Sequence, residues 1–191
     1  YVPTSPPQGI VTALVTPFRE DERIDFNAWQ RIIDVQMKSG VDGLLAAGGQ
    51  GEVYSLDEEE RTVALRFCRQ AVGGRAALYG NVGAVSTRET VRLAQKGEAE
   101  GIDYAVVITP YYLRPSQDEL VQHYSDVCRA VRIPVLAYNI PERTGVELTN
   151  ETLRRIAHLC ENFVGLKDST CKLDQIPDLA AMRRHGPCVV I

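Results

Sequence analysis

Phe163-Val164-Gly165-Leu166-Lys167-Asp168-Ser169-Thr170 is a short apolar run that ends on a lysine, with a carboxylate and two hydroxyls just beyond it. Because polar residues do not alternate within the run, it predicts a strand that is buried on both faces, as the strands of a parallel sheet are. A lysine at the end of such a strand is partly withdrawn from water, which favours its neutral, nucleophilic form. Lys167 is therefore a candidate Schiff-base lysine, or a lysine that has merely left the core at a strand end.

Similar apolar runs recur along the chain about every 25 to 35 residues, the length of one βα unit. Between them lie patterns with apolar residues at helical spacing, several of which begin with a capping residue and acidic side chains. Strands are expected at 10–15, 43–47, 76–80, 104–110, 135–138, 163–167 and 188–191, and helices at 26–38, 57–72, 86–100, 116–131, 149–159 and 173–184.

Alternating strands and helices of this kind form a doubly wound open sheet or a (β/α)₈ barrel. Residues suited to chemistry or to backbone binding follow the ends of successive strands, and a barrel would gather all of these ends around one mouth. The sequence therefore predicts an α/β chain with the (β/α)₈ TIM barrel fold, present through about strand seven. The residues that follow the strand ends are Thr16, 48–52, Asn81, Tyr111, Tyr112, Tyr138 and Lys167.

We expect residues 1–191 to form one partial barrel domain that lacks the last barrel units and the C-terminal helices. A typical barrel needs about 250 residues, so we expect the sequence to be part of a longer protein.

Composition narrows the classes of function. A net charge of -4, with 24% charged and 45% hydrophobic residues, gives no electrostatic footprint for nucleic acid or for an anionic membrane surface. No apolar segment approaches the roughly 20 residues that a membrane helix needs. The expected partner is therefore a small molecule, with no nucleic acid and no membrane.

The cysteines and histidines show no metal-ligand spacing. The cysteines lack a CxxC pattern and are expected to be reduced, buried thiols in a cytoplasmic protein, and the histidines lie on predicted helices or their ends. No metal site is therefore expected. The cysteines are Cys68, Cys128, Cys160, Cys171 and Cys188, and the histidines are His123, His158 and His185.

Five motifs occur in order along the chain, at 9–18, 48–52, 109–112, 138–145 and 164–168. They read GIVTALVTPF, GGQGE, TPYY, YNIPERTG and VGLKD. Together these motifs resemble the dihydrodipicolinate synthase and N-acetylneuraminate lyase family of pyruvate-type class I aldolases. The resemblance covers nearly the whole chain, and it ends before the last two barrel units of that family.

The resemblance implies three catalytic residues. Lys167 would attack the ketone of pyruvate or another 2-oxo acid and form an imine, so no separate cofactor is expected. Tyr138 would transfer protons; its alternative is a core aromatic whose hydroxyl is satisfied locally. Tyr112 would reach across the interface of a homodimer or homotetramer into the neighbouring site, although an exposed aromatic residue there can also be simple interface filler.

The resemblance also implies three substrate-binding residues. In the turn at 48–52, around Gly49 and Gln50, backbone N–H groups would bind the 2-oxo acid carboxylate; a plain tight turn is the alternative. The family more often has hydroxyl residues at these two positions. Arg143 would bind a second carboxylate of the substrate, or else it would be an exposed arginine paired with Glu142 or Glu147.

The expected function is a Schiff-base lyase or synthase that forms or cleaves a carbon-carbon bond, similar to 4-hydroxy-tetrahydrodipicolinate synthase. Arg143 and Tyr112 favour this activity, whereas Gly49 and Gln50 favour an aldolase or dehydratase of 2-oxo-3-deoxy sugar acids. A non-catalytic barrel paralogue or an inactive fragment is the alternative from another class of protein.

Overall fold

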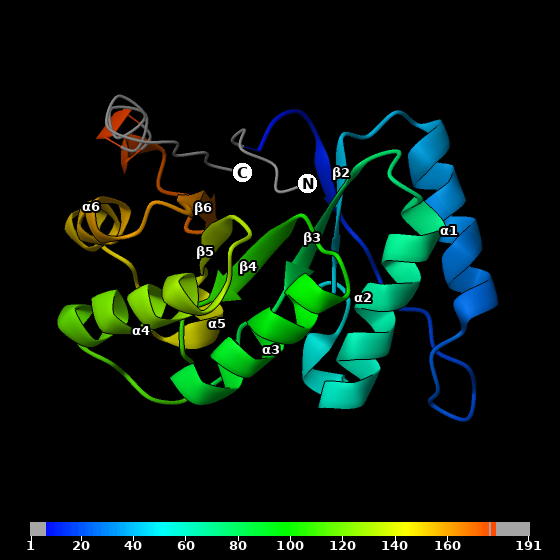
Figure 1. Ribbon diagram of the computed structural model, residues 1–191, viewed down its shortest axis with the longest axis horizontal. Coiled ribbons are helices and arrows are strands. Elements are labelled where there is room, and N and C mark those ends of the chain that lie inside the picture. Colours follow the sequence, from blue (N-terminus) through cyan, green and yellow to red (C-terminus); the bar gives the residue numbers. More distant parts are fainter. Residues whose placement is uncertain (1–6, 176, 179–191) are drawn as a thin grey trace.

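The computed structural model describes residues 7–175, 177 and 178, in which six parallel strands form one curved sheet. The strands follow the chain order β1-β2-β3-β4-β5-β6, and the helices lie along the outer face of the sheet (Figure 1). The strands are β1 (Val11–Ala13), β2 (Gly43–Ala46), β3 (Ala77–Asn81), β4 (Tyr104–Ile108), β5 (Val135–Asn139) and β6 (Phe163–Asp168). The helices are α1 (Phe26–Lys38), α2 (Glu58–Val72), α3 (Thr87–Ala99), α4 (Gln117–Ala130), α5 (Pro141–Thr144) and α6 (Asn150–Leu159), with short 3₁₀ turns η1 (Val53–Ser55) and η2 (Leu173–Gln175).

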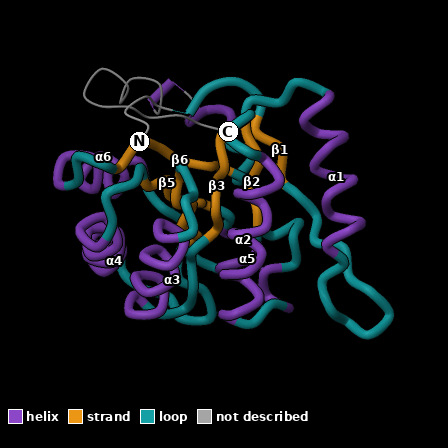
Figure 2. The backbone as a smooth tube through the Cα atoms, turned by 45° about the vertical axis from the view of Figure 1, so that its right-hand side comes forward, coloured by secondary structure: helices purple, strands orange, loops and turns teal. Residues whose placement is uncertain are grey.

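This strand order confirms the predicted fold class. In a doubly wound sheet the order reverses at a switch point, whereas here each strand pairs with the next one along the chain. Figure 2 shows the strands gathered at the centre, with the helices outside them. The arrangement is that of a (β/α)₈ barrel through its sixth strand. The expected strand at 188–191 and most of the expected helix at 173–184 lie outside the described residues.

Side chains alternate between two apolar layers along each central strand. In β5, Val135 and Ala137 pack in the core beneath the helices, whereas Leu136 and Tyr138 pack in a second cluster on the opposite face. That opposite face corresponds to the interior of a barrel. The central strands are therefore buried on both faces, which is why their sequences are apolar without alternation.

A β-bulge changes this alternation in β6. Val135 pairs with Phe163, but Leu136 pairs with Gly165, so β6 contains one extra residue at Val164. Because of this extra residue, Leu166 packs beneath the helices, and Lys167 pairs with Tyr138 on the barrel-interior face. The bulge therefore determines the face from which the lysine emerges.

Several observed elements differ from the predictions. β1 has three residues, Val11–Ala13, instead of the expected range 10–15. α5 and η1 were not predicted, because four and three residues are too few to show a periodic pattern. The expected strand at 104–110 ends at Ile108, ahead of Pro110, which has no N–H to donate to a ladder.

The prediction for the cysteines was wrong at one described position. Cys68, Cys128 and Cys160 are buried free thiols, but Cys171 is exposed. It lies beyond the end of β6, and its φ angle is 59°. Cys188 lies outside the described residues. No helix in the described part of the chain is long and apolar enough to cross a membrane.

Candidate active site

Lys167 and Tyr138 meet at the carboxyl ends of β6 and β5. The two residues are register partners, and the Lys167 ammonium nitrogen Nζ lies 3.6 Å from the centroid of the Tyr138 ring. Nζ also lies 3.5 Å from Oγ of Ser169, at the limit of a hydrogen bond. The contact between lysine and tyrosine therefore runs through the face of the ring. The proton transfer expected of Tyr138 uses its phenol hydroxyl, and the described hydrogen bonds include none between that hydroxyl and Lys167.

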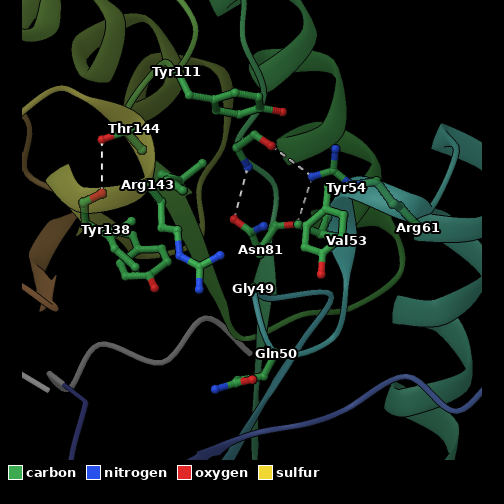
Figure 3. A pocket seen from close by; sticks show the side chains of 13 residues that line it. Gly49, Gln50, Val53, Tyr54, Arg61, Asn81, Tyr111, Tyr138, Arg143 and Thr144 are labelled. Carbon is green, nitrogen blue, oxygen red and sulfur yellow. Dashed lines mark hydrogen bonds between the residues drawn. The ribbon is translucent and has the colours of Figure 1, made fainter.

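A cavity of about 430 Å³ opens beside this pair at the carboxyl ends of the strands. Its wall combines residues from the ends of β3, β4 and β5, from the turn after β2, and from α2 and α5 (Figure 3). A volume of this size is typical of a small-molecule site. The lining residues are Gly49, Gln50, Val53, Tyr54, Arg61, Asn81, Gly83, Ile108, Tyr111, Tyr138, Ile140, Arg143 and Thr144.

The turn after β2 offers two backbone donors. The N–H groups of Gly51, Glu52 and Val53 donate to carbonyls of Gly48 or Gly49 within the turn. Among the hydrogen bonds of the described residues, none uses the N–H of Gly49 or Gln50 as donor. These two groups therefore remain available to a ligand anion, which is compatible with the expected role of the turn.

Two buried polar contacts hold this turn in place. The Thr16 hydroxyl, just beyond β1, donates to the Gly51 carbonyl at 2.7 Å, and the Asn81 amide donates to the Ala47 carbonyl at 2.9 Å. Gly51 is tightly enclosed, since an added Cβ would lie 3.0 Å from the Leu14 carbonyl oxygen and 3.1 Å from the Thr16 hydroxyl. The ends of β1 and β3 thus fix the backbone between them.

Arg143 lines the cavity from α5 and lies beside Tyr138 in Figure 3. The ion pairs found within the described ranges do not include Arg143, and Glu147 pairs instead with Lys172 at 2.5 Å. Among the described residues, Arg143 therefore forms no ion pair with Glu142 or Glu147, the alternative considered for it. The Arg143 guanidinium is free to meet an anion in the cavity.

Two of the predicted catalytic residues do not line the cavity. Lys167 contacts the face of the Tyr138 ring, and Tyr112 is 92% exposed; neither is among the lining residues. Tyr112 also has a φ angle of 74°, an unusual conformation for a non-glycine residue. The neighbouring Tyr111 does line the cavity.

Arg61 is the principal residue of the cavity that the sequence analysis missed. It comes from α2, whereas the predicted site residues follow strand ends. Only 8% of Arg61 is exposed, and burial lowers the pKa of its guanidinium from the usual value. A signal was present in the sequence, because Arg61 continues the apolar stripe of α2 formed by Ala64, Leu65, Cys68 and Val72.

No metal centre is evident in the part of the chain that the structure describes. Within residues 7–175, 177 and 178, no group of three or more histidine, cysteine, aspartate or glutamate side chains could hold a metal ion. The groups gathered in and beside the cavity are a lysine amine, phenols, two arginines and backbone N–H groups.

Comparison with known proteins identifies relatives with this fold. The 4-hydroxy-tetrahydrodipicolinate synthase of Mesorhizobium japonicum is 37% identical over 171 residues, which cover 90% of this chain and 58% of the relative. The crystal structure of a chloride-inhibited dihydrodipicolinate synthase from Acinetobacter baumannii, complexed with pyruvate, matches with a TM-score of 0.92 and 33% identity, over 96% of this chain and 63% of that one.

A third relative is YagE, a prophage protein of the dihydrodipicolinic acid synthase family from E. coli K12, also solved in complex with pyruvate. It matches with a TM-score of 0.90 and 32% identity, over 95% of this chain and 62% of that one. The chain thus spans about three-fifths of the length of these relatives. The model of the dihydrodipicolinate synthetase family matches residues 6–186. The chain therefore belongs to the dihydrodipicolinate synthetase family.

Proposed function

We propose that the protein containing this chain is a Schiff-base lyase or synthase that acts on pyruvate or another 2-oxo acid. The observation that carries the proposal is the contact between the Lys167 amine and Tyr138 beside a cavity with two arginines. Two similar proteins, from Acinetobacter baumannii and E. coli, have been solved in complex with pyruvate. The activity is the formation or cleavage of a carbon-carbon bond.

In the proposed reaction, the neutral amine of Lys167 attacks the ketone carbon of the 2-oxo acid. The ketone oxygen leaves as water, and the resulting imine accepts the electron pair that is released or used at the neighbouring carbon. Tyr138 transfers the protons, after a change of the Lys167 rotamer brings Nζ to its hydroxyl. The imine is the electron sink, so the proposal requires neither a metal nor a separate cofactor.

The carboxylate of the 2-oxo acid is proposed to bind the N–H groups of Gly49 and Gln50. Their freedom from hydrogen bonds within the turn supports this assignment. Arg143 is proposed to bind the carboxylate of an aldehyde partner such as aspartate semialdehyde, because its guanidinium lines the cavity without an acidic partner. This reaction corresponds to that of the 4-hydroxy-tetrahydrodipicolinate synthases to which the chain is similar.

A second candidate is an aldolase or dehydratase of 2-oxo-3-deoxy sugar acids. Gly49 favours it, since it carries no hydroxyl to join a proton relay, and a Cβ built there would have no neighbour within 4 Å. That open space leaves room for a longer, hydroxylated substrate. A non-catalytic protein of the same fold is disfavoured by the presence of Lys167, Tyr138 and Arg143 together.

We further propose a single barrel domain, a cytoplasmic location and a homodimer or homotetramer. The assembly would bring Tyr112 into the site of a neighbouring copy. The buried, reduced Cys68, Cys128 and Cys160 support the proposed location. The exposure of Tyr112 supports the proposed assembly.

Borohydride trapping tests the imine. The full-length protein is incubated with pyruvate and sodium borohydride, digested, and analysed by peptide mass spectrometry, with Lys167→Ala as the matched variant. The expected result is a reduced pyruvate adduct confined to the peptide that contains Lys167, and none in the variant. If the folded wild-type protein forms no adduct, the imine mechanism is wrong and the non-catalytic alternative takes its place.

A further inference from the structure

Arg61 is a buried arginine that binds the backbone at the end of β3. Its Nη2 donates to the Gly83 carbonyl at 2.9 Å and to the Asn81 carbonyl at 3.3 Å (Figure 3). The two acceptors are two positions apart, so one nitrogen binds the chain on both sides of Val82. Arg61 therefore fixes the course of the backbone where it leaves β3.

The charge of Arg61 has a cost at this position. Only 8% of the residue is exposed, and burial lowers the pKa of its guanidinium, because desolvation disfavours the charged form. An apolar side chain of similar length would fill the same space without that cost. What Arg61 contributes here is therefore its hydrogen-bond donors.

Asn81 connects the end of β3 to the turn at 48–52. Its Nδ2 donates to the Ala47 carbonyl at 2.9 Å, and its Oδ1 accepts the Gly83 N–H at 3.4 Å. Asn81 is 4% exposed, so little water competes for these bonds. The amide reaches Ala47 only from a fixed backbone, and the Asn81 carbonyl is one of the two that Arg61 binds.

This turn needs such external support. The residues that flank its glycine-rich segment, Ala47 and Glu52, have φ angles of 53° and 51°, in the left-handed region that non-glycine residues rarely adopt. Such a conformation persists only where surrounding contacts impose it. The hydrogen bond from Asn81 is one of those contacts, and the N–H groups of Gly49 and Gln50 lie within the segment it supports.

We propose that Arg61 is a positioning residue for the turn that binds the 2-oxo acid carboxylate. It acts through Asn81: Arg61 holds the end of β3, and the Asn81 amide holds the start of the turn. The free N–H groups of Gly49 and Gln50 thereby keep a fixed direction. This inference rests on the proposed function, and it extends the site to a residue that need not contact pyruvate.

Hydrogen exchange of the turn tests the positioning without requiring catalysis. The N–H groups of Gly51, Glu52 and Val53 donate within the turn, and they are protected while the turn keeps its shape. In the full-length Arg61→Met variant, which keeps the length of the side chain but loses its donors, these amides should exchange at least about tenfold faster than in the wild type. An unchanged exchange rate would overturn the proposal.

Arg69→Met is the matched control on the same helix. Arg69 also donates to a backbone carbonyl, that of Gly101 at 3.1 Å, and it pairs with Asp103 ahead of β4, at the opposite ends of the strands. Its loss should leave exchange in the turn unchanged. If Arg69→Met accelerates exchange in the turn as much as Arg61→Met does, the effect is a general loss of stability and the positioning role is wrong.

Arg61→Lys is a second variant, which also serves if Arg61→Met does not fold. Lysine keeps a donor but lacks the planar guanidinium, so exchange in the turn should accelerate by about threefold, less than with methionine. An exchange rate equal to that of the wild type would show that the guanidinium does not hold the turn.

The dependence of imine formation on pyruvate concentration tests the consequence for binding. In the borohydride experiment, the concentration for half-maximal adduct formation should rise about tenfold in Arg61→Met, whereas the limiting rate should stay within about twofold. The hydrogen bonds of Arg61 do not involve Lys167 or Tyr138, so the chemical step should not depend on it. A lower limiting rate at an unchanged half-maximal concentration would contradict the proposal.

A double-mutant cycle shows whether Arg61 acts through Asn81. Asn81→Ala should raise the half-maximal concentration to a similar extent, and adding Arg61→Met to it should change the value by less than about twofold. If the two effects multiply, Arg61 meets the ligand directly and the proposal is overturned. If the wild type forms no adduct at all, the proposed function fails, and hydrogen exchange still decides whether Arg61 positions the turn.

Discussion

His123 is a buried histidine that the proposed reaction does not use. It is 3% exposed on α4, its Nδ1 lies 2.9 Å from the Thr87 hydroxyl of α3, and its Nε2 has no hydrogen-bond partner in the described part of the chain. Burial lowers the pKa of His123 from 6.5 to about 4, against a weaker opposing effect of Asp126. The imidazole is therefore neutral in the folded protein at neutral pH, and protonation favours the unfolded chain.

This pKa difference predicts a loss of stability in mild acid. Between pH 6.5 and pH 4 the unfolded state binds a proton that the folded state does not bind, so stability falls as the pH falls. The free energy of unfolding should decrease by about 2 kcal/mol from pH 7.5 to pH 5 because of His123. Urea denaturation at both pH values measures the decrease, and it should largely disappear in His123→Asn. Equal pH dependence of the two proteins would contradict the assignment.

At the scale of elements, the first turn of α2 positions Arg61. Asp57 caps this helix with a reciprocal capping box: its carboxylate accepts the Glu60 N–H at 2.8 Å, and the Glu60 carboxylate accepts the Asp57 N–H at 2.9 Å. The first intrahelical bond then runs from the Arg61 N–H to the Asp57 carbonyl at 3.0 Å. Capping by a residue on the surface thus fixes the point from which the buried arginine enters the cavity.

Asp57→Ala should lower the free energy of unfolding by about 1 kcal/mol, because the N–H of Glu60 loses its acceptor. Asp57→Asn keeps an acceptor at this position and should lose less than half as much. Urea denaturation of both variants and the wild type measures the difference. If asparagine and alanine are equally destabilising, the side-chain hydrogen bond does not carry the stabilisation of this helix end.

At the scale of the whole molecule, the position of Tyr112 bears on the assembly. The side chain is 92% exposed and its backbone adopts a φ angle of 74°, so within one chain it makes little packing contact to compensate for that conformation. Leu113 beside it is also 60% exposed. Contact with a second copy of the protein would give both side chains a packing role.

Subunit complementation tests whether Tyr112 acts in a neighbouring site. Lys167→Ala and Tyr112→Phe are each expected to be strongly impaired, but in a mixed dimer one site receives an intact Lys167 from one chain and an intact Tyr112 from the other. Co-expression of the two variants should restore about a quarter of the wild-type activity, the fraction expected for random pairing.

Co-expression of Lys167→Ala with Tyr138→Phe is the matched control. Lys167 and Tyr138 contact each other within one chain, at 3.6 Å, so no mixed dimer regains a complete pair. No activity should return in this control. If it recovers as much activity as the Tyr112 pairing does, or if neither pairing recovers any, Tyr112 does not act across the interface.

Helix positions were predictable from the sequence because they depend on local signals. The range 26–38 was predicted to its ends, since Asp25 accepts the Ala28 N–H and Gly40 follows the helix with a φ angle of 75°. Short elements such as α5 were missed because a single helical turn carries no periodicity. The cavity was only partly predictable: Tyr138 and Arg143 belong to motifs, whereas Arg61 was hidden in an amphipathic helix.

By itself the sequence determined the succession of buried strands and capped helices, and hence the parallel barrel fold. These features follow from short-range patterns of polarity. The tertiary structure alone decided which face Lys167 occupies. One extra residue in β6 turns that side chain toward Tyr138, and a bulge depends on pairing with a strand whose partner residues lie about 28 positions away in the sequence. It also decided that Arg61 is buried in the cavity wall and bonded to the carbonyls of Asn81 and Gly83, because those carbonyls belong to a strand end about 20 residues away in the sequence.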